Sequence, residues 1–118
     1  LIFDDVIKFV SREIRRGSKY NCFILDPPAY GRGTHGEMWK MEDNLLELLK
    51  NIKMLFADKL YFFIMNTYSA NINVYTLYNL LENYFPEKGA LEYGDLCLKE
   101  SSCSRILSCN IYARWRSG

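Results

Sequence analysis

The sequence predicts an α/β fold with a mainly parallel sheet and an antiparallel hairpin at its C-terminal end, on the basis of three patterns. The stretches 23–25 and 60–65 are apolar at successive positions, which is typical of strands that helices cover on both faces. Apolar residues recur at helical spacing before, between and after these stretches. The stretch 107–115 alternates apolar and polar residues, as in a strand with two unlike faces. This alternation of helices and strands favours one mixed domain.

The composition is that of a globular chain. With 118 residues, of which 49% are hydrophobic, the chain can bury roughly two-thirds of its unfolded surface. The net charge is +1, so any phosphate-binding surface has to be local. No apolar run is long enough to cross a bilayer. We therefore expect a protein without a membrane partner.

The four cysteines, at positions 22, 97, 103 and 109, have neither Cys-x-x-Cys spacing nor partner histidines. We expect reduced thiols, buried or on strands, in a cytoplasmic protein without a metal site. Acidic residues follow the first three positions directly, so we expect no signal peptide. The absence of an initiating methionine favours a chain that begins inside a domain.

The first predicted helix follows residues 1–3, which resemble the end of a strand, and begins at Asp4. From the residues alone, Asp4 and Asp5 form an N-cap and an adjacent acid that the helix dipole favours. Gly17 ends this helix. The apolar stripe consists of Val6, Ile7, Val10 and Ile14, and the polar face includes Lys8, Ser11, Arg12, Glu13, Arg15 and Arg16.

Two further helices and a strand are predicted in the middle of the chain. An apolar stripe predicts a helix from Glu42 to Phe56 that lies on the sheet. The run 60–65 predicts a buried parallel strand, and the polar residues 66–69 follow it at the same sheet edge as the end of the first strand. A third helix is predicted at 74–84 and ends at Pro86.

The C-terminal part reads as a hairpin. A short strand is predicted at 96–99, a turn at 100–104 and the last strand at 107–115. Gly94 interrupts the pattern before the short strand, and we expect a β-bulge there.

The strongest candidate for a site is the stretch 23–30, where an apolar strand ends in Asp26, two prolines and Tyr30. In open α/β sheets ligands bind at the carboxyl ends of the strands, so Asp26 is expected to face a crevice. Neither proline can donate a ladder hydrogen bond, which leaves the carbonyls of Asp26 and Pro27 available to a ligand. A plain strand-terminating turn is the alternative explanation of these residues.

The residues Gly31–Gly36 satisfy Gly-x-Gly-x-x-Gly, but their setting argues against a dinucleotide site. Five residues separate the strand from the first glycine, and the helical pattern begins only near position 42. We expect a glycine-rich loop over the crevice. In it, Arg32 and Lys40 can meet phosphate, and His35 is expected to be solvated.

Several motifs together resemble the class I S-adenosylmethionine-dependent methyltransferases. Asp-Pro-Pro-x-Tyr at 26–30 is similar to their motif IV, in the form found in ribosomal RNA methyltransferases. The segments 4–6, 15–17, 31–33 and 36–40 are similar, in that order, to a subgroup of these enzymes. The resemblance spans most of the chain.

The resemblance implies the second half of a Rossmann-like, seven-stranded sheet, mainly parallel with an antiparallel C-terminal hairpin. Residues 1–118 would then be the C-terminal part of a single catalytic domain. The glycine-rich motif I and the acid that binds the ribose precede this part in the family, and the chain has neither. We therefore expect an unpaired apolar edge at the strand ending in Asp26, and an inactive isolated chain.

The cofactor implied is S-adenosylmethionine. By the match to motif III, Asp5 accepts a hydrogen bond from the adenine amino group and the amide of Val6 faces the ring, with Asp4 left as the helix cap. Asp26 and Pro28 are implied as further cofactor contacts.

The substrate implied is a base in RNA, ribosomal RNA in particular. Asp26 and the Pro27 carbonyl accept hydrogen bonds from the base, and Tyr30 stacks on it. These three are the expected catalytic residues. Further substrate contacts are expected from Arg32, Lys40 and Asn66.

The implied reaction is methyl transfer, more favourably to nitrogen than to carbon five of a pyrimidine. Attack on carbon five needs a covalent nucleophile, and related enzymes place a cysteine near motif IV or after the following strand. Here Pro28-Ala29 and 67–69 occupy those places, and Cys22 lies at the other end of its strand. The alternative is a non-catalytic methyltransferase-like module that binds RNA or a partner. A nicotinamide-binding domain is a third class and would bind its cofactor at Gly31–Gly36.

Overall fold

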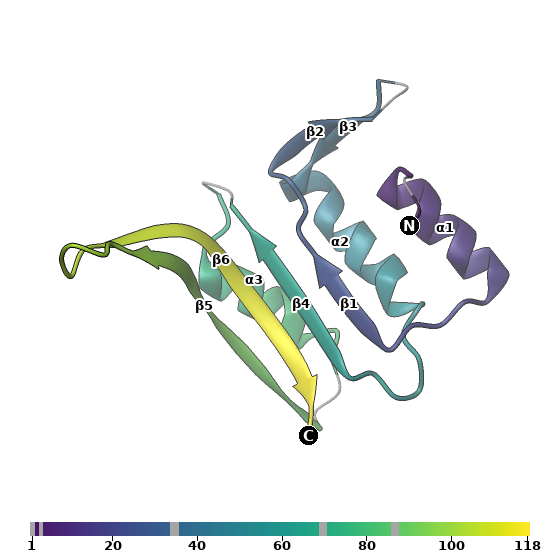
Figure 1. The fold of residues 1–118 in the computed structure, drawn as a ribbon. Coiled ribbons are helices and arrows are strands. Elements are labelled where there is room, and N and C mark those ends of the chain that lie inside the picture. Colours follow the sequence, from purple (N-terminus) through teal and green to yellow (C-terminus); the bar gives the residue numbers. More distant parts are fainter. Residues whose placement is uncertain (1, 3, 34–35, 69–70, 86–87) are drawn as a thin grey trace.

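The computed structural model describes residues 2, 4–33, 36–68, 71–85 and 88–118. Helices and strands alternate from the N-terminus, and two long strands follow at the C-terminus (Figure 1). The elements are α1 (Val6–Arg16), β1 (Cys22–Leu25), β2 (Tyr30–Arg32), β3 (Met38–Lys40), α2 (Met41–Lys53), β4 (Phe62–Thr67), α3 (Val74–Glu82), β5 (Gly89–Lys99) and β6 (Ile106–Ser117).

Four strands form the main sheet, in the order β1-β4-β6-β5. β1 pairs with β4 in parallel, and β6 is antiparallel to both β4 and β5. Consequently β1, β4 and β5 run in one direction, and β6 lies between β4 and β5 in the other. The predicted α/β class and the antiparallel C-terminal hairpin are confirmed, but the described sheet is mixed: β1 and β4 form its one parallel pair, and the other two pairs are antiparallel.

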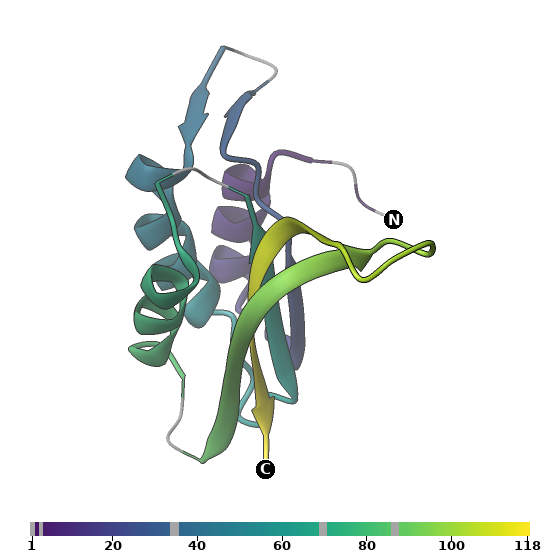
Figure 2. The same cartoon turned by 90° about the vertical axis from the view of Figure 1, so that its left-hand side faces the viewer.

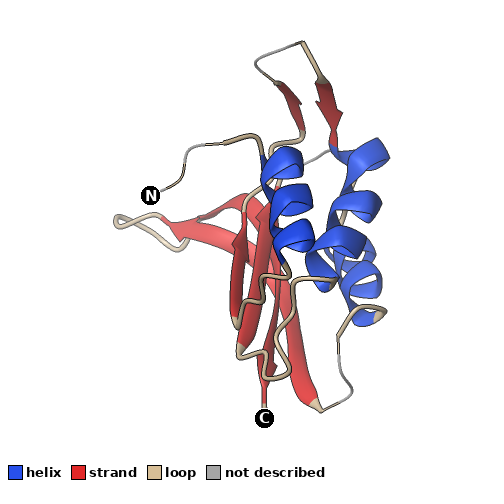
Figure 3. Cartoon of the chain, turned by 90° about the vertical axis from the view of Figure 1, so that its right-hand side faces the viewer, coloured by secondary structure: helices blue, strands red, loops and turns tan. Residues whose placement is uncertain are grey.

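The helices α1, α2 and α3 all lie on one side of this sheet (Figures 2 and 3). The burial of the strand residues reflects this position of the helices. In β4, Phe63, Met65 and Thr67 are buried and the residues between them are half-buried. In β1, the Ile24 side chain is 72% exposed. Among the described residues helices cover one face only, so the expected cover on both faces is not found within them.

The core lies between the helices and the sheet, and aromatic rings fill one end of it. The Phe63 and Phe85 ring centroids are 4.9 Å apart, and Phe85 stacks on Trp115 at 5.6 Å. α2 supplies the apolar stripe expected of it, and its buried members are Leu45, Leu48, Leu49 and Ile52. The packing of α2 fixes the start of that helix next to the end of β1.

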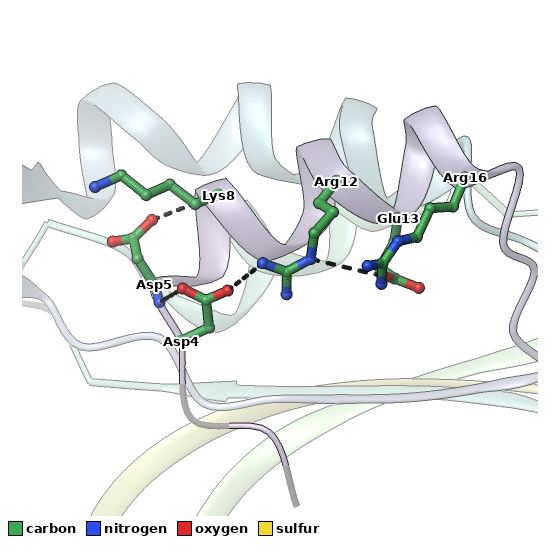
Figure 4. Close-up of polar contacts among 6 residues, drawn as sticks. All are labelled: Asp4, Asp5, Lys8, Arg12, Glu13 and Arg16. Carbon is green, nitrogen blue, oxygen red and sulfur yellow. Dashed lines mark hydrogen bonds and ion pairs between the residues drawn. The ribbon is translucent and has the colours of Figure 1, made fainter.

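α1 departs from prediction at its first turn. Its N-cap is Asp5, whose carboxylate accepts from the Lys8 amide at 3.0 Å, and not Asp4. The Asp4 carboxylate instead accepts from the Asp5 amide and from Arg12, at 2.9 and 2.6 Å (Figure 4). Gly17 ends the helix with φ 69°, as predicted. Of residues 1–3, Leu1 and Phe3 lie outside the described residues.

Glu13 of α1 does not belong to a solvated face as predicted. Its side chain is 7% exposed. The carboxylate accepts hydrogen bonds from the Tyr20 hydroxyl at 2.6 Å and from Arg16 at 2.9 Å. The Tyr20 and Ser18 hydroxyls and then Arg16 lower the pKa of Glu13 from 4.5 to about 2. A carboxylate can be buried here because its oxygens are paired.

The segment predicted as a glycine-rich loop is largely a hairpin. β2 and β3 pair antiparallel, with Tyr30 opposite Lys40 and Gly31 opposite Trp39. The Gly33 amide donates to the Glu37 carbonyl at 2.8 Å. His35, which we expected to be solvated, lies outside the described residues.

The C-terminal hairpin is longer than predicted. β5 begins at Gly89 instead of near Leu96, and the register shift in the ladder falls between Leu96 and Cys97 instead of at Gly94. All four cysteines are free and exposed, so none is buried; Cys22, Cys97 and Cys109 lie on strands, which was the other expectation, and Cys103 lies in the turn between β5 and β6. Pro86, the expected end of the third helix, lies outside the described residues.

Candidate functional site

A cavity of about 580 Å³ opens at the carboxyl end of β1. Four elements enclose it: the first turn of α1, the end of β1, the hairpin β2–β3 and the first half of α2. Its walls are mostly apolar, and three of the residues that line it carry carboxylates: Asp5, Asp26 and Glu37. The residues that line it include Asp5, Val6, Ile24, Asp26, Pro27, Pro28, Arg32, Trp39 and Asn44. A concave, mostly apolar space with a few polar groups is typical of a ligand site.

Asp26 is held by a neighbouring strand. Leu25 pairs with Met65, so the next residues of the two parallel strands, Asp26 and Asn66, lie side by side. The Asn66 amide nitrogen donates to Asp26 Oδ1 at 2.7 Å. Within the described chain, the second carboxylate oxygen of Asp26 has no hydrogen-bond partner. One oxygen is fixed and the other can accept from a ligand.

The carbonyls of Pro27 and Pro28 differ in the hydrogen bonds that they accept. The Trp39 indole nitrogen donates to the Pro28 carbonyl oxygen at 2.7 Å. The Pro27 carbonyl has only a contact of 3.5 Å with the Thr67 hydroxyl, whose nearer neighbour is the Met41 sulfur at 3.1 Å. Since a hydrogen bond of 3.5 Å is weak, the Pro27 carbonyl keeps acceptor capacity and the Pro28 carbonyl is engaged.

Trp39 is the residue of the site that sequence reasoning missed. Its backbone lies opposite Gly31 in the hairpin. The Met41 amide donates to the Ala29 carbonyl at 3.1 Å. Together these contacts tie the Asp-Pro-Pro segment to the hairpin and to the start of α2. A tryptophan so close to the Asp-Pro-Pro segment was the available signal, because an indole N–H away from water needs an acceptor.

Asp5 and Val6 lie on the opposite wall, in the first turn of α1. One Asp5 oxygen caps the helix, so the role of helix cap, assigned to Asp4 from the sequence, belongs to Asp5. Lys8, one turn on, forms an ion pair with Glu37 of the hairpin at 2.9 Å. The hydrogen bond with Glu37 raises the pKa of Lys8. This ion pair links α1 to the hairpin across the cavity.

Only some of the residues predicted to contact the substrate line the cavity. Arg32 lines the cavity, whereas Tyr30 and Lys40 do not. The Tyr30 side chain is 53% exposed, and its hydroxyl lies 3.5 Å from the Met38 sulfur. Asn66 contacts Asp26 and does not line the cavity. Asp5, Val6, Asp26, Pro27, Pro28 and Arg32 are the predicted site residues that share the cavity.

Two general properties bear on the class of protein. None of the helices that the structure describes is long and apolar enough to cross a membrane. In the same part of the chain, no group of three or more His, Cys, Asp or Glu side chains could hold a metal ion.

Comparison with protein-family models finds no match, and comparison with curated proteins finds none. Solved structures do match. A SAM-dependent methyltransferase from Agrobacterium tumefaciens is 32% identical, with a TM-score of 0.87 over 95% of this chain and 38% of that chain. SMU.776, a methyltransferase by assignment, was solved with SAH; it is 18% identical, with a TM-score of 0.65 over 98% of this chain and 31% of that chain. M1.HpyAVI is 11% identical, with a TM-score of 0.57 over 99% of this chain and 54% of that chain, and was also solved with SAM.

The Agrobacterium protein is similar to the chain in sequence as well as in fold, whereas the other two neighbours show the fold. The chain matches the Agrobacterium protein over nearly its whole length, although it spans only 38% of that protein. The alternating helices and strands and the mixed sheet with its reversed last strand agree with this match. The chain therefore belongs to the superfamily of S-adenosylmethionine-dependent methyltransferases with the class I fold.

Proposed function

We propose that this chain is the C-terminal part of a catalytic domain that transfers a methyl group from S-adenosylmethionine to a nitrogen of a base in RNA, and in ribosomal RNA in particular. One observation carries the proposal. Asp5, Asp26, Pro27 and Pro28, predicted from two separate motifs, line a single cavity at the carboxyl end of β1. The 32% identity to a SAM-dependent methyltransferase supports the same reaction class.

The cavity suits the adenine-bearing part of the cofactor. Its volume lies in the range of small-molecule sites, and Val6 and Ile24 give it apolar walls against which a flat ring can pack. Asp5 has one carboxylate oxygen in the helix cap and a second to accept from an amino group. Asp26 and Pro28 lie on the other wall and complete the cofactor contacts. When bound, the cofactor supplies a methyl group on a positively charged sulfur.

The acceptors beside the cavity suit an amino group of a base. Asp26 presents its second carboxylate oxygen, and the Pro27 carbonyl is close to it in the chain. Two acceptors on one amino group fix its direction and leave its lone pair for the in-line attack that methyl transfer requires. A base must leave its stack to be held in this way. Tyr30, whose exposed ring lies next to these acceptors in the chain, can stack on it, a contact worth about 1–3 kcal/mol.

The positive side chains beside the cavity suit the RNA backbone. Arg32 lines the cavity and Lys40 is exposed on the paired strand of the hairpin. Phosphate contacts of this kind position a nucleic acid without reading its bases. Asn66 contributes through Asp26, and its second amide hydrogen remains for a substrate oxygen.

The positions of the cysteines support a nitrogen target. Attack on carbon five of a pyrimidine needs a thiolate next to the base. Cys22 is at the amino end of β1, opposite to the cavity, and the other three cysteines lie on the hairpin β5–β6. No cysteine lines the cavity in the part of the chain that the structure describes.

A non-catalytic, methyltransferase-like module that binds RNA is the second candidate. One observation favours it: β1 is at the sheet edge, with no described strand on its outer side to carry the rest of a cofactor site. The two functions differ in a simple titration. A complete domain that contains this chain binds S-adenosylmethionine if it is an enzyme and does not bind it if it is such a module.

The proposal is tested by substitutions in the complete domain, with cofactor affinity and single-turnover methylation of ribosomal RNA measured in parallel. Asp26→Ala should lower the methylation rate on the order of a hundredfold, because misplacement by about 1 Å has that effect, and change cofactor affinity far less. Tyr30→Ala should do the same, and Tyr30→Phe, which keeps the stacking face, should be mild.

Cys22→Ser is the control in this series and should leave the rate nearly unchanged. If Cys22→Ser abolished transfer while Asp26→Ala did not, the non-covalent mechanism would be wrong.

A further inference from the structure

The outer end of β5 is an exposed strand edge. β5 is the last strand of the main sheet, and no described strand pairs with its outer side. The hairpin β5–β6 extends away from the helices and the rest of the sheet, as two perpendicular views show (Figures 1 and 2). All side chains from Asp95 to Lys99 are exposed. An edge of this kind is a template for pairing with another strand.

This edge has an apolar face. Leu98 pairs with Leu107 across the hairpin, so the two side chains lie on the same face, and each is 64% exposed. Leu96 is two residues from Leu98 and therefore shares that face. Three exposed leucines at the end of a projecting hairpin are more than scattered apolar residues at a surface.

The opposite face of the same segment carries two charges without partners. Among the described residues, Asp95 and Lys99 form no ion pair. The other charged residues of the hairpin form ion pairs within it: Glu92 pairs with Arg114 and Arg116, and Glu100 pairs with Arg105. Asp95 and Lys99 are thus the charges left to select a partner.

The segment Asp95–Lys99 is complementary to a second copy of itself that runs in the opposite direction. Reading outward from Cys97, a leucine stands on each side, then Asp95 on one side and Lys99 on the other. In an antiparallel pair of two identical strands centred on Cys97, Leu96 faces Leu98 of the other copy, and Asp95 faces Lys99. The two-fold axis makes each contact occur twice. The same segment in a parallel pair would place like charges together.

We propose that this edge binds a second copy of the chain, with the β5 segments Asp95–Lys99 paired antiparallel about a two-fold axis at Cys97. The main-chain groups of the edge then complete a ladder across the two copies. The leucines of both copies, with Leu107, form one apolar patch on one face of the joint sheet. The two Asp95–Lys99 ion pairs lie on the other face and set the register.

Cysteine crosslinking tests the position of the axis. Residues directly opposite in an antiparallel ladder have Cα atoms about 4.5 or 5.5 Å apart, which a disulfide can span. A variant that keeps only Cys97, with the other three cysteines changed to serine, should form a covalent dimer on mild oxidation. The matched control keeps only Cys103, which is also exposed but lies at the end of the hairpin. Equal crosslinking of the two variants, or none at Cys97, overturns the proposal.

Charge exchange tests the register without oxidation. Under reducing conditions, Asp95→Lys should raise the dissociation constant of the dimer roughly tenfold, because it replaces two ion pairs with two like-charge contacts. Lys99→Asp should do the same. The double exchange restores both ion pairs and should return the constant to within about threefold of the original.

Analytical ultracentrifugation measures these constants, and circular dichroism checks that each variant is folded. Association through the exposed edge of β1 would be unchanged by all three variants and would count against the proposal. A chain that stays monomeric at high micromolar concentration would also contradict it.

Discussion

Asp26 is the residue on which the proposed chemistry depends, and Asn66 decides how it is presented. The Asn66 amide holds one carboxylate oxygen at 2.7 Å and so leaves the other directed elsewhere. An unheld carboxylate at the end of a strand would sample several rotamers. Asn66 is thus a positioning residue in this account.

Asn66→Ala should lower the methylation rate of the complete domain roughly fivefold, which corresponds to a lost hydrogen bond of about 1 kcal/mol. Cofactor affinity should stay unchanged, since Asn66 does not line the cavity. Asn83→Ala is the control, because Asn83 bonds only a carbonyl of its own helix. A loss of cofactor affinity equal to the loss of rate would show that Asn66 is structural.

At the level of residues, the sequence predicted some positions and not others for a physical reason. Asp26 could be placed because the end of an apolar strand is a feature of the chain itself. The cap of α1 was assigned to Asp4 and belongs to Asp5, because either acid can occupy that position by sequence and Asp4 instead pairs with Arg12. Trp39 was missed because its partner, the Pro28 carbonyl, is brought near only by the hairpin.

Among the elements, α1 is attached to the chain that follows it through a buried carboxylate. Glu13 accepts from the hydroxyl of Tyr20, which lies in the segment between α1 and β1. Sequence periodicity places Glu13 among solvated residues, and only the return of the chain at Tyr20 supplies its partner. Because this contact uses an ionised carboxylate, the attachment of α1 to the following chain depends on pH.

The chain should therefore lose stability in acid at this link. The pKa of Glu13 is lowered from 4.5 to about 2, so its contribution to the free energy of unfolding is complete above pH 4.5 and is lost as the pH falls towards 2. Tyr20→Phe should be less stable than the original at pH 7, and this difference should shrink between pH 4.5 and 2.

Urea unfolding at a series of pH values measures the effect. Tyr61→Phe is the matched control, because the hydroxyl of Tyr61 has no hydrogen-bond partner among the described residues. A difference between the original and Tyr20→Phe that does not change with pH would contradict the assignment.

The hairpin β2–β3 shows where element prediction from sequence fails. Its strands have three residues each, too short for an alternating pattern, and the glycines suggest a loop. Trp39, opposite Gly31 in this hairpin, donates to the Pro28 carbonyl, a contact between residues eleven positions apart that no local pattern reveals. The longer elements α2 and β6 were found because their apolar residues repeat over several turns or strand positions.

For the whole molecule, the sheet has an open edge and an open face. β1 is the edge strand and Ile24 is largely exposed, while all three helices lie on the other face. In the solved structures the matching region is 31–54% of a longer chain. We propose that further strands and helices of the same domain cover this edge and this face. The sequence could predict the open edge, because it lacks the residues of motif I.

If the chain is the C-terminal part of its domain, as proposed, it holds only the adenine-facing part of the site, and the isolated chain should not bind S-adenosylmethionine measurably in calorimetry. Joined to the rest of its domain it should bind. Asp5→Ala should then weaken binding by about 1 kcal/mol, as for one hydrogen bond to a neutral group. Micromolar binding by the isolated chain would contradict this division of the site.

The central claim is methyl transfer to a base nitrogen held by Asp26 and Tyr30. The most direct test incubates the complete domain with labelled S-adenosylmethionine and unmodified ribosomal RNA, digests the RNA to nucleosides and identifies the labelled product by mass spectrometry. The account predicts a base methylated at nitrogen, with the yield abolished by Asp26→Ala and kept by Cys22→Ser. A labelled 5-methylpyrimidine, or no label in the RNA from a domain that binds the cofactor, would contradict it.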